Sequence, residues 1–151
     1  MCLMLSTIYF LNNELNCICF YVIRNKKIAE VLDLDFGYME KKRFAADQPT
    51  ILSLHADVRN KVVVIVDDII DTGRTAVRAA DFLLKEGAKS IIGCFTHGVL
   101  SSGAVERVEN SSFDKIFITD TIVPRDFSSS KINIVSSNDF IMDFINLMLG
   151  F

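Results

Sequence analysis

Uninterrupted apolar stretches alternate along this chain with segments whose apolar positions recur at helical spacing. The clearest stretch is Lys61–Val66, where five β-branched residues follow one another, as is typical of a strand buried on both faces of a parallel sheet. Further strands are expected at Leu34–Met39, Thr50–Leu54, Ser90–Phe95, Lys115–Ile118 and Ile132–Val135. Helices are expected at Arg24–Leu32, Ala76–Lys85, Ser102–Val108 and Asp139–Leu149. The alternation predicts an α/β fold with a parallel sheet and helices on both of its faces.

The loop Asp67–Thr75 follows the clearest strand and precedes a predicted helix. In open parallel sheets, ligands bind beyond the carboxyl ends of the strands. This loop occupies such a position. Gly87 lies just past the end of the helix that follows, as a C-terminal cap does.

The first 23 residues contain two apolar runs, Met1–Leu11 and Cys17–Ile23. Neither run reaches the roughly 20 residues that a membrane-spanning helix needs. No Lys or Arg precedes the first run, so it lacks the basic start of a signal peptide. We interpret this part as a segment covered in the core, with a weak membrane-directed signal as the alternative. We therefore assign residues 1–23 as a separate apolar segment and residues 24–151 as one domain.

The composition of the chain argues against several classes of function. With 151 residues, half of them hydrophobic, the chain can form one domain with a single core. The net charge is −3 and no long basic run is present, which argues against a nucleic-acid-binding protein held by phosphate contacts. The cysteines are Cys2, Cys17, Cys19 and Cys94. Their spacing does not suit a zinc site, so we expect reduced thiols in a cytoplasmic protein, with Cys94 buried in its strand.

Two adjacent carboxylates, Asp67 and Asp68, directly follow the β-branched strand. Because side chains alternate between the two faces of a strand, at least one of them would otherwise point into the core. A buried carboxylate without a partner is costly. The pair is better explained by sugar hydroxyls, or by a divalent cation held between protein and ligand, than by a solvated loop.

The residues Asp71, Thr72, Gly73, Arg74 and Thr75 come next, directly before the predicted helix. The free amides and the positive dipole end of a helix N-terminus form an anion site. Gly73 permits close approach of the backbone to a ligand and a positive φ, and both threonines offer hydroxyl donors. In the alternative, Thr72 or Thr75 only caps the helix. The loop as a whole predicts a site for a sugar and its phosphate.

The residues Val62–Thr75 together resemble the phosphoribosyl-pyrophosphate (PRPP) motif, which type I phosphoribosyltransferases and ribose-phosphate pyrophosphokinases (PRPP synthetases) share. Arg74 fits the transferases somewhat better. Other segments resemble the synthetases, namely Asn25–Leu34, the Lys41-Lys42-Arg43 run, Thr96–Ser111 and Thr119–Ile122. Their order along the chain favours a synthetase, and the likeness runs from about Asn25 to the C-terminus.

This resemblance implies a type I phosphoribosyltransferase-like fold and the activity of a ribose-phosphate diphosphokinase. Such an enzyme moves the β,γ-diphosphoryl group of Mg-ATP to the 1-hydroxyl of ribose 5-phosphate, giving PRPP and AMP for nucleotide biosynthesis. The implied roles are that Asp71–Thr75 holds the 5-phosphate, and that Asp67 and Asp68 hold the ribose hydroxyls with Mg²⁺ nearby. Lys41 and Arg43 would stabilise charge on the transferring group. From the residues alone, Lys41–Arg43 would instead be interpreted as a solvated charged loop.

Members of that family are longer and pair two similar α/β domains, of which this chain resembles the second. The first 23 residues match no part of the family, and the half that supplies most adenine contacts is missing. Two alternatives stay open: a type I phosphoribosyltransferase, for which we find no base-recognising hood, and a non-catalytic subunit of a longer synthetase. Because the face that packs on the first domain would be exposed, we expect homo-oligomers or association with a longer PRPP synthetase. Nucleic acids and membranes are not expected as partners.

Overall fold

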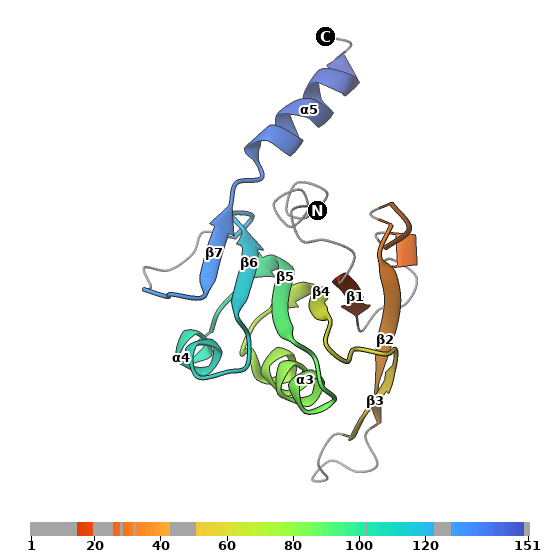
Figure 1. Cartoon of the computed structure of the whole chain (residues 1–151). Helices are drawn as coiled ribbons and strands as arrows, with labels where there is room; N and C mark the ends of the chain where they lie inside the picture. The colour runs from red at the N-terminus through yellow and green to blue at the C-terminus, as the bar shows by residue number, and fades with distance from the viewer. Residues whose placement is uncertain are drawn as a thin grey trace.

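The computed structural model describes residues 15–19, 26–27, 29–31, 33–42, 51–101, 103–122 and 128–149 of the chain. Its strands and helices, labelled as in Figure 1, are β1 (Leu15–Cys19), β2 (Asp35–Lys42), β3 (Ile51–His55), β4 (Val62–Ile70), α3 (Arg74–Lys85), β5 (Ser90–Gly98), α4 (Ala104–Glu109), β6 (Lys115–Thr119), β7 (Ile132–Val135) and α5 (Asn138–Leu149). Residues 26–27 and 29–31 are also helical, as predicted. The prediction for residues 1–14 lies outside the described residues.

The described strands form one seven-stranded sheet in the order β3-β2-β1-β4-β5-β6-β7. Every neighbouring pair is parallel except β2 and β3, which are antiparallel and form one edge of the sheet. The predicted α/β fold with a parallel sheet is therefore confirmed. The parallel strands all point their carboxyl ends toward the same edge, at which any ligand site is expected.

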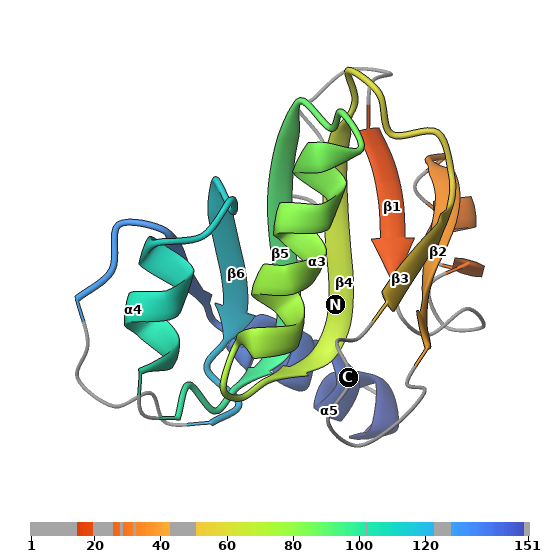
Figure 2. The ribbon, with the colours of Figure 1, turned by 90° about the horizontal axis from the view of Figure 1, so that it is seen from below.

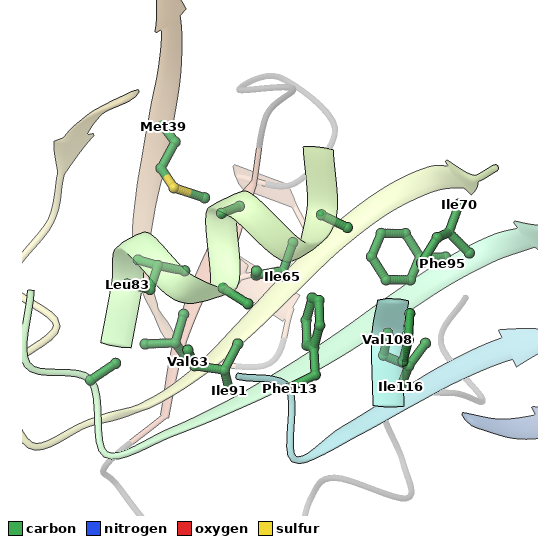
Figure 3. Packing of buried hydrophobic residues seen from close by; sticks show 14 of the residues in the cluster. Met39, Val63, Ile65, Ile70, Leu83, Ile91, Phe95, Val108, Phe113 and Ile116 are labelled. Carbon is green, nitrogen blue, oxygen red and sulfur yellow. The ribbon is translucent and has the colours of Figure 1, made fainter. Parts of the chain in front are cut away.

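Side chains of β4 alternate between two buried layers, so the strand is covered on both faces. On one face, Ile65 packs in a cluster with Leu83 of α3 and Val108 of α4, and Figure 3 shows these residues around the strand. Figure 2 shows α3 and α4 side by side over this face. On the other face, Val66 packs in a cluster with Ala29 of the helical segment near residue 30. The same second cluster contains Cys94, which is buried as expected.

The strand β1 lies in the middle of the sheet, between β2 and β4 and parallel to both. Cys19 is opposite Tyr38 of β2 on one side and Val66 of β4 on the other. The apolar pattern predicted a covered segment here but no strand, and we had placed these residues apart from the domain. The backbone of residues 15–19 belongs to the same sheet as the rest. No helix in the described part of the chain is long and apolar enough to cross a membrane.

Several predicted boundaries are wrong, and three of them lie beside the predicted site at the carboxyl edge of the sheet. Glu40–Lys42 continues β2 as a strand because it pairs with β3, where a loop was expected. The strand β4 continues through Asp67 and Asp68 to Ile70 because it still pairs with β5 there. Helix α3 begins at Arg74, two residues early. The predicted loop is thereby reduced to Asp71–Gly73.

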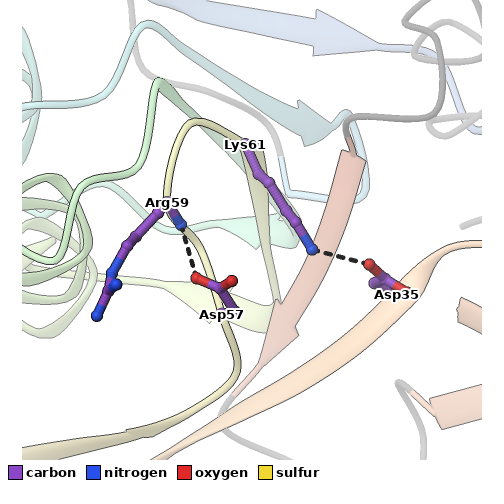
Figure 4. Close-up of polar contacts among 4 residues, drawn as sticks. All are labelled: Asp35, Asp57, Arg59 and Lys61. Atoms are coloured by element: carbon purple, nitrogen blue, oxygen red, sulfur yellow. Dashed lines mark hydrogen bonds and ion pairs between the residues drawn. The ribbon is translucent and has the colours of Figure 1, made fainter.

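Polar contacts link neighbouring segments at the opposite edge of the sheet, where the parallel strands have their amino ends (Figure 4). Lys61 Nζ lies 2.9 Å from Oδ2 of Asp35, which joins the start of β2 to the residue before β4. The amide of Arg59 donates a hydrogen bond of 3.2 Å to Oδ1 of Asp57 within the preceding turn. Asp35 is largely exposed, so the ion pair contributes at most about 1 kcal/mol.

The helix α5 extends from the end of β7 away from the sheet (Figure 1). The large apolar side chains that the structure describes in this helix are between 39% and 70% exposed. They are Phe140, Ile141, Met142, Ile145, Met148 and Leu149. The molecule therefore carries an apolar helix that no described element covers.

Candidate functional site

The loop Asp71–Gly73 leads from the carboxyl end of β4 into α3. Gly73 is the N-cap of α3 with φ of 71°, in the left-handed region, and no side chain caps the helix. The alternative that Thr72 or Thr75 caps α3 is therefore wrong, and both side chains are exposed. A residue with a Cβ is strained at this φ, so glycine is required by the backbone conformation of the turn.

The first amides of α3 are available to a ligand. Within the described residues, no acceptor is paired with the amides of residues 72–76, whereas the amide of Val77 donates to the carbonyl of Gly73 at 2.9 Å. Asp71, Thr72, Arg74 and Thr75 are all exposed around them. Unpaired amides at the positive end of a twelve-residue helix form a site for an anion such as a phosphate.

Asp67 and Asp68 stand at the end of β4 beside this loop. Asp67 is half-buried and Asp68 is exposed, and the amide of Asp68 donates a hydrogen bond of 2.9 Å to Oδ1 of Asp67. Burial raises the pKa of Asp67, and the neighbouring charge of Asp68 raises it further, against the opposing effect of that hydrogen bond. A divalent cation or a hydrogen-bond donor at the two carboxylates would relieve their repulsion, so the pair suits a metal ion or a sugar hydroxyl.

The carboxylates of Asp67 and Asp68 suit Mg²⁺ better than they suit a metal ion whose ligands are all protein side chains. In the described part of the chain, no cluster of three His, Cys, Asp or Glu side chains gathers. Mg²⁺ is commonly held by one or two carboxylates together with water and substrate oxygens. Asp67 and Asp68 could supply those carboxylates.

Lys41 lies at the same edge of the sheet as the loop. Tyr38 of β2 and Val66 of β4 are opposite each other across β1. Lys41 is three residues beyond Tyr38, as Ile69 is beyond Val66, so the backbones of Lys41 and Ile69 reach the same level. At the last paired level, Tyr38 and Val66 lie two strand spacings apart, which is about 10 Å.

Arg43, the second residue expected to stabilise charge, lies outside the described residues. Lys41 pairs with Leu52 of β3, so its backbone belongs to the antiparallel edge hairpin and not to a loop. The structure thus brings Asp67, Asp68 and the residues 71–75 together, with the backbone of Lys41 two strands away.

A second polar group lies at the ends of β5 and β6. His97 Nδ1 is 2.7 Å from Oγ1 of Thr121, and Thr119 Oγ1 donates to the carbonyl of Thr96 at 2.6 Å. The two threonine hydroxyls are 2.8 Å apart. These contacts hold the turn after β6 where the register of β5 and β6 shifts. They explain His97 as a residue of β5 that helps to hold the turn after β6, and we assign it no catalytic role.

One contact to the loop was not foreseen from the sequence. The guanidinium of Arg107, on α4, donates a hydrogen bond to the carbonyl of Thr72. Arg107 lies in the segment Thr96–Ser111, whose resemblance gives it no role at the loop, and the two residues are 35 positions apart. Only the packing of α4 beside α3 brings them together.

Comparison with known proteins identifies relatives of this arrangement. A family described as phosphoribosyl synthetase-associated domain matches residues 36–148. The ribose-phosphate pyrophosphokinase of Thermotoga maritima is 39% identical over 124 residues, which cover 82% of this chain and 39% of that protein. The Clostridium acetobutylicum protein of the same name is 36% identical over 137 residues, covering 85% of this chain and 43% of that protein. The chain thus spans less than half the length of these relatives.

Solved structures show the same fold. Phosphoribosylpyrophosphate synthetase from Mycobacterium smegmatis superposes with a TM-score of 0.85 at 24% identity, covering 98% of this chain and 50% of that chain. Adenine phosphoribosyltransferase from Giardia lamblia superposes with a TM-score of 0.62 at 15% identity, covering 76% of this chain and 73% of that chain. The predicted type I phosphoribosyltransferase-like fold is confirmed.

Proposed function

Because this chain belongs to the phosphoribosyl synthetase family, we propose that it carries the ribose 5-phosphate half of a ribose-phosphate diphosphokinase site. The complete reaction moves the diphosphoryl group of Mg-ATP to the 1-hydroxyl of ribose 5-phosphate and yields PRPP and AMP. The observation that carries the proposal is the N-terminus of α3. No side chain caps it, and its first amides are unpaired beside Asp67 and Asp68. A phosphate and the hydroxyls of its sugar can engage these two groups together.

The 5-phosphate would bind at residues 71–75. Amides of the turn and of the first helical residues donate to its oxygens, and the hydroxyls of Thr72 and Thr75 add donors. Arg74, exposed at the first helical position, adds a positive charge. This assignment uses the residues that face solvent at the loop and requires no rearrangement of the core.

Asp67 and Asp68 would accept hydrogen bonds from the ribose hydroxyls. Asp67 and Asp68 would also hold Mg²⁺, which when bound would neutralise negative charge on the phosphate groups. Burial and the charge of Asp68 raise the pKa of Asp67, so a donor or a cation would stabilise its ionised form. The two carboxylates thus orient the sugar relative to its phosphate.

Lys41 and Arg43 would stabilise charge on the transferring diphosphoryl group. Transfer of a phosphoryl-type group is mainly positioning combined with electrostatic stabilisation by cations. The backbone of Lys41 lies in β2 at the carboxyl edge of the sheet, which is also the edge of the loop, and this placement supports the role.

The ATP site would lie in the part of these relatives that the match does not cover, since the match spans 39% and 43% of two of them. The exposed apolar residues of α5 favour assembly with a longer synthetase or with further copies of this chain. The same observation favours a second candidate, a non-catalytic subunit that binds ribose 5-phosphate or PRPP within such an assembly. In either role the protein would act in nucleotide biosynthesis in the cytoplasm.

A thermal-shift titration tests the proposed function. A ligand that binds only the folded state raises the melting temperature by mass action. With Mg²⁺ present, ribose 5-phosphate should raise it and ribose should not, because the loop recognises the phosphate. Asp71→Ala should reduce the shift, whereas Asp143→Ala removes the same charge from exposed α5 and should leave the shift unchanged.

The outcomes separate the candidates. A phosphate-dependent shift together with AMP production from ATP supports the diphosphokinase. The same shift without AMP production by the chain alone, together with binding to a longer synthetase, supports the non-catalytic subunit. Release of pyrophosphate from PRPP and a base would instead identify a phosphoribosyltransferase. A folded sample that shows no shift with ribose 5-phosphate contradicts the assignment of the loop.

A further inference from the structure

Hydrogen-bond donors hold every carbonyl of the turn that leads into α3. The amides of Val99 and Leu100 donate to the carbonyl of Ile70 at 3.0 and 3.2 Å, the amide of Ser101 donates to Asp71 at 3.2 Å, and Nη1 of Arg107 donates to Thr72. The carbonyl of Gly73 accepts from Val77 within the first turn of α3, at 2.9 Å. The segment from β5 to α4 therefore supports the turn from one side.

This support determines where the amides of the turn point. A trans peptide unit holds its N–H opposite to its C=O, and no peptide bond in the described residues is cis. The carbonyls of residues 71, 72 and 73 share their peptide units with the amides of Thr72, Gly73 and Arg74. Each held carbonyl therefore turns the amide of its peptide unit away from the carbonyl's own partner, and successive free amides in a turn can bind an anion together.

Arg107 differs from the other donors to these carbonyls. Among the described residues, it is the one side chain that bonds a carbonyl of the turn, since the remaining donors are backbone amides. It is half-buried on α4.

We propose that Arg107 is a positioning residue for the phosphate of ribose 5-phosphate. Its guanidinium holds the Thr72 carbonyl and so keeps the amides of residues 72–74 aimed at the phosphate before the ligand arrives. This role rests on the proposed function of the loop. A turn that is already ordered loses less conformational entropy on binding, so its affinity is higher.

The contact is suited to ordering the turn rather than to supporting the fold. Thr72 is exposed, so its carbonyl can accept a hydrogen bond from water when Arg107 is replaced. Removal of the guanidinium should therefore release the turn and leave the core intact. A residue that acted only through stability would change the melting temperature and leave the mobility of the turn in the folded protein unchanged.

The test uses the full chain and three variants. Arg107→Met keeps the aliphatic stem without the donor, Arg107→Gln keeps a shorter donor, and Arg78→Met removes one exposed positive charge from α3 as the matched control. Backbone order parameters for residues 72–74 are measured by NMR relaxation without ligand. Calorimetry then measures the dissociation constants of ribose 5-phosphate and of inorganic phosphate with Mg²⁺ present.

The expected result is lower order parameters at residues 72–74 in Arg107→Met and a dissociation constant for ribose 5-phosphate that rises roughly tenfold to a hundredfold, as for a lost hydrogen bond to a charged group. Arg78→Met should change neither measurement. Unchanged order parameters in both Arg107 variants would overturn the positioning role, as would an equal loss of affinity in Arg78→Met. If the unmodified chain binds no ribose 5-phosphate, the proposed function fails, and the order parameters still decide whether Arg107 holds the turn.

Discussion

The amide of Asp68 donates a hydrogen bond of 2.9 Å to Oδ1 of Asp67, so the two carboxylates of the β4 end are joined through the backbone as well as by their charges. Because burial raises the pKa of Asp67, the folded state binds more protons than the unfolded state as the pH rises above the ordinary value of 3.8. Stability therefore falls through that window and stays lower at neutral pH. The ionised carboxylate of Asp67 therefore lowers the stability of the protein without ligand.

We predict that Asp67→Asn raises the melting temperature at pH 7 and weakens binding of ribose 5-phosphate with Mg²⁺. The amide removes the unfavourable buried charge, and it also removes the ligand for a cation. Thermal denaturation between pH 3 and pH 8 should show the gain vanishing at the acidic end. Asp57→Asn, in the turn at the other edge of the sheet, serves as the control. An Asp67→Asn variant that is less stable than the unmodified chain at neutral pH would contradict this prediction.

The hydrogen bonds of Glu109 predict that stability changes with pH in the opposite direction. Its carboxylate accepts hydrogen bonds from Ser129, from Ser130 and from the amide of Lys131, and these bonds lower its pKa to about 2. For a carboxylate with a lowered pKa, the stabilisation is complete above the ordinary value of 4.5 and is lost as the pH falls toward 2.

Glu109→Gln should therefore lower the melting temperature at pH 7, and the difference from the unmodified chain should shrink between pH 4.5 and pH 2. Glu106→Gln, which removes a carboxylate from the same helix, should have a smaller effect without this pH profile. Differential scanning calorimetry over that range makes the comparison. A difference that stays constant with pH would show that the hydrogen bonds of Glu109 do not support the segment 129–131.

Gly93 of β5 is fixed by the rings around it. A Cβ at this position would lie 2.7 Å from Cε2 of Phe95 and 3.1 Å from Cε1 of Phe113. Gly93→Ala should therefore lower the free energy of unfolding by about 1–3 kcal/mol, as overpacking of a core does. In a Phe95→Leu background the same substitution should cost less, because the ring edge is gone. Urea denaturation of the four proteins gives this coupling, and additive losses would rule out the steric explanation.

The exposed apolar residues of α5 should drive association. Patches of this kind are commonly buried against another molecule. We expect the chain to form oligomers at micromolar concentration in analytical ultracentrifugation, and Phe140→Gln with Met148→Gln to shift it toward monomers. Val31→Gln is the control, because Val31 is 70% exposed, as is Met148, but lies outside α5. A monomer at high concentration would contradict this expectation.

Lys41 is expected to act on the transition state. In any assembly where the chain supports turnover, Lys41→Ala should lower kcat by roughly a hundredfold to a thousandfold. The affinity for ribose 5-phosphate should change little, because the lysine is expected to contact the transferring group. Lys42→Ala removes the same charge one position along and should have a weaker effect. A loss confined to ribose 5-phosphate binding would argue for a ground-state role instead.

The apolar pattern predicts the presence and type of most elements but not their ends. Val62–Val66 identifies β4 because β-branched residues buried on both faces suit few other structures. Asp67 and Asp68 end the apolar run, yet the strand continues through them, since Asp67 still pairs with Phe95 of β5. That pairing depends on the register of a second strand, which a single strand's composition does not contain.

Non-local contacts also explain which features the sequence did not predict. Leu15–Cys19 is a strand because β2 and β4 flank it, and both lie later in the chain. Similarly, Asp71 and Gly73 carry a recognisable motif, whereas Arg107 reaches Thr72 only after α4 has packed beside α3. Local chemistry was therefore predictable at the loop, and the residue that supports the loop from another element was not.

The central position of β1 has a consequence for how rigidly the proposed site is assembled. In the described sheet, β1 is hydrogen-bonded to β2, which contains Lys41, on one side and to β4, which leads to Asp71, on the other. The two parts of the proposed site are therefore connected through the backbone hydrogen bonds of β1. Fluctuations that open β1 would let the hairpin and the phosphate turn move independently. Amide hydrogen exchange in residues 15–19 therefore reports the free energy that couples the two halves of the site.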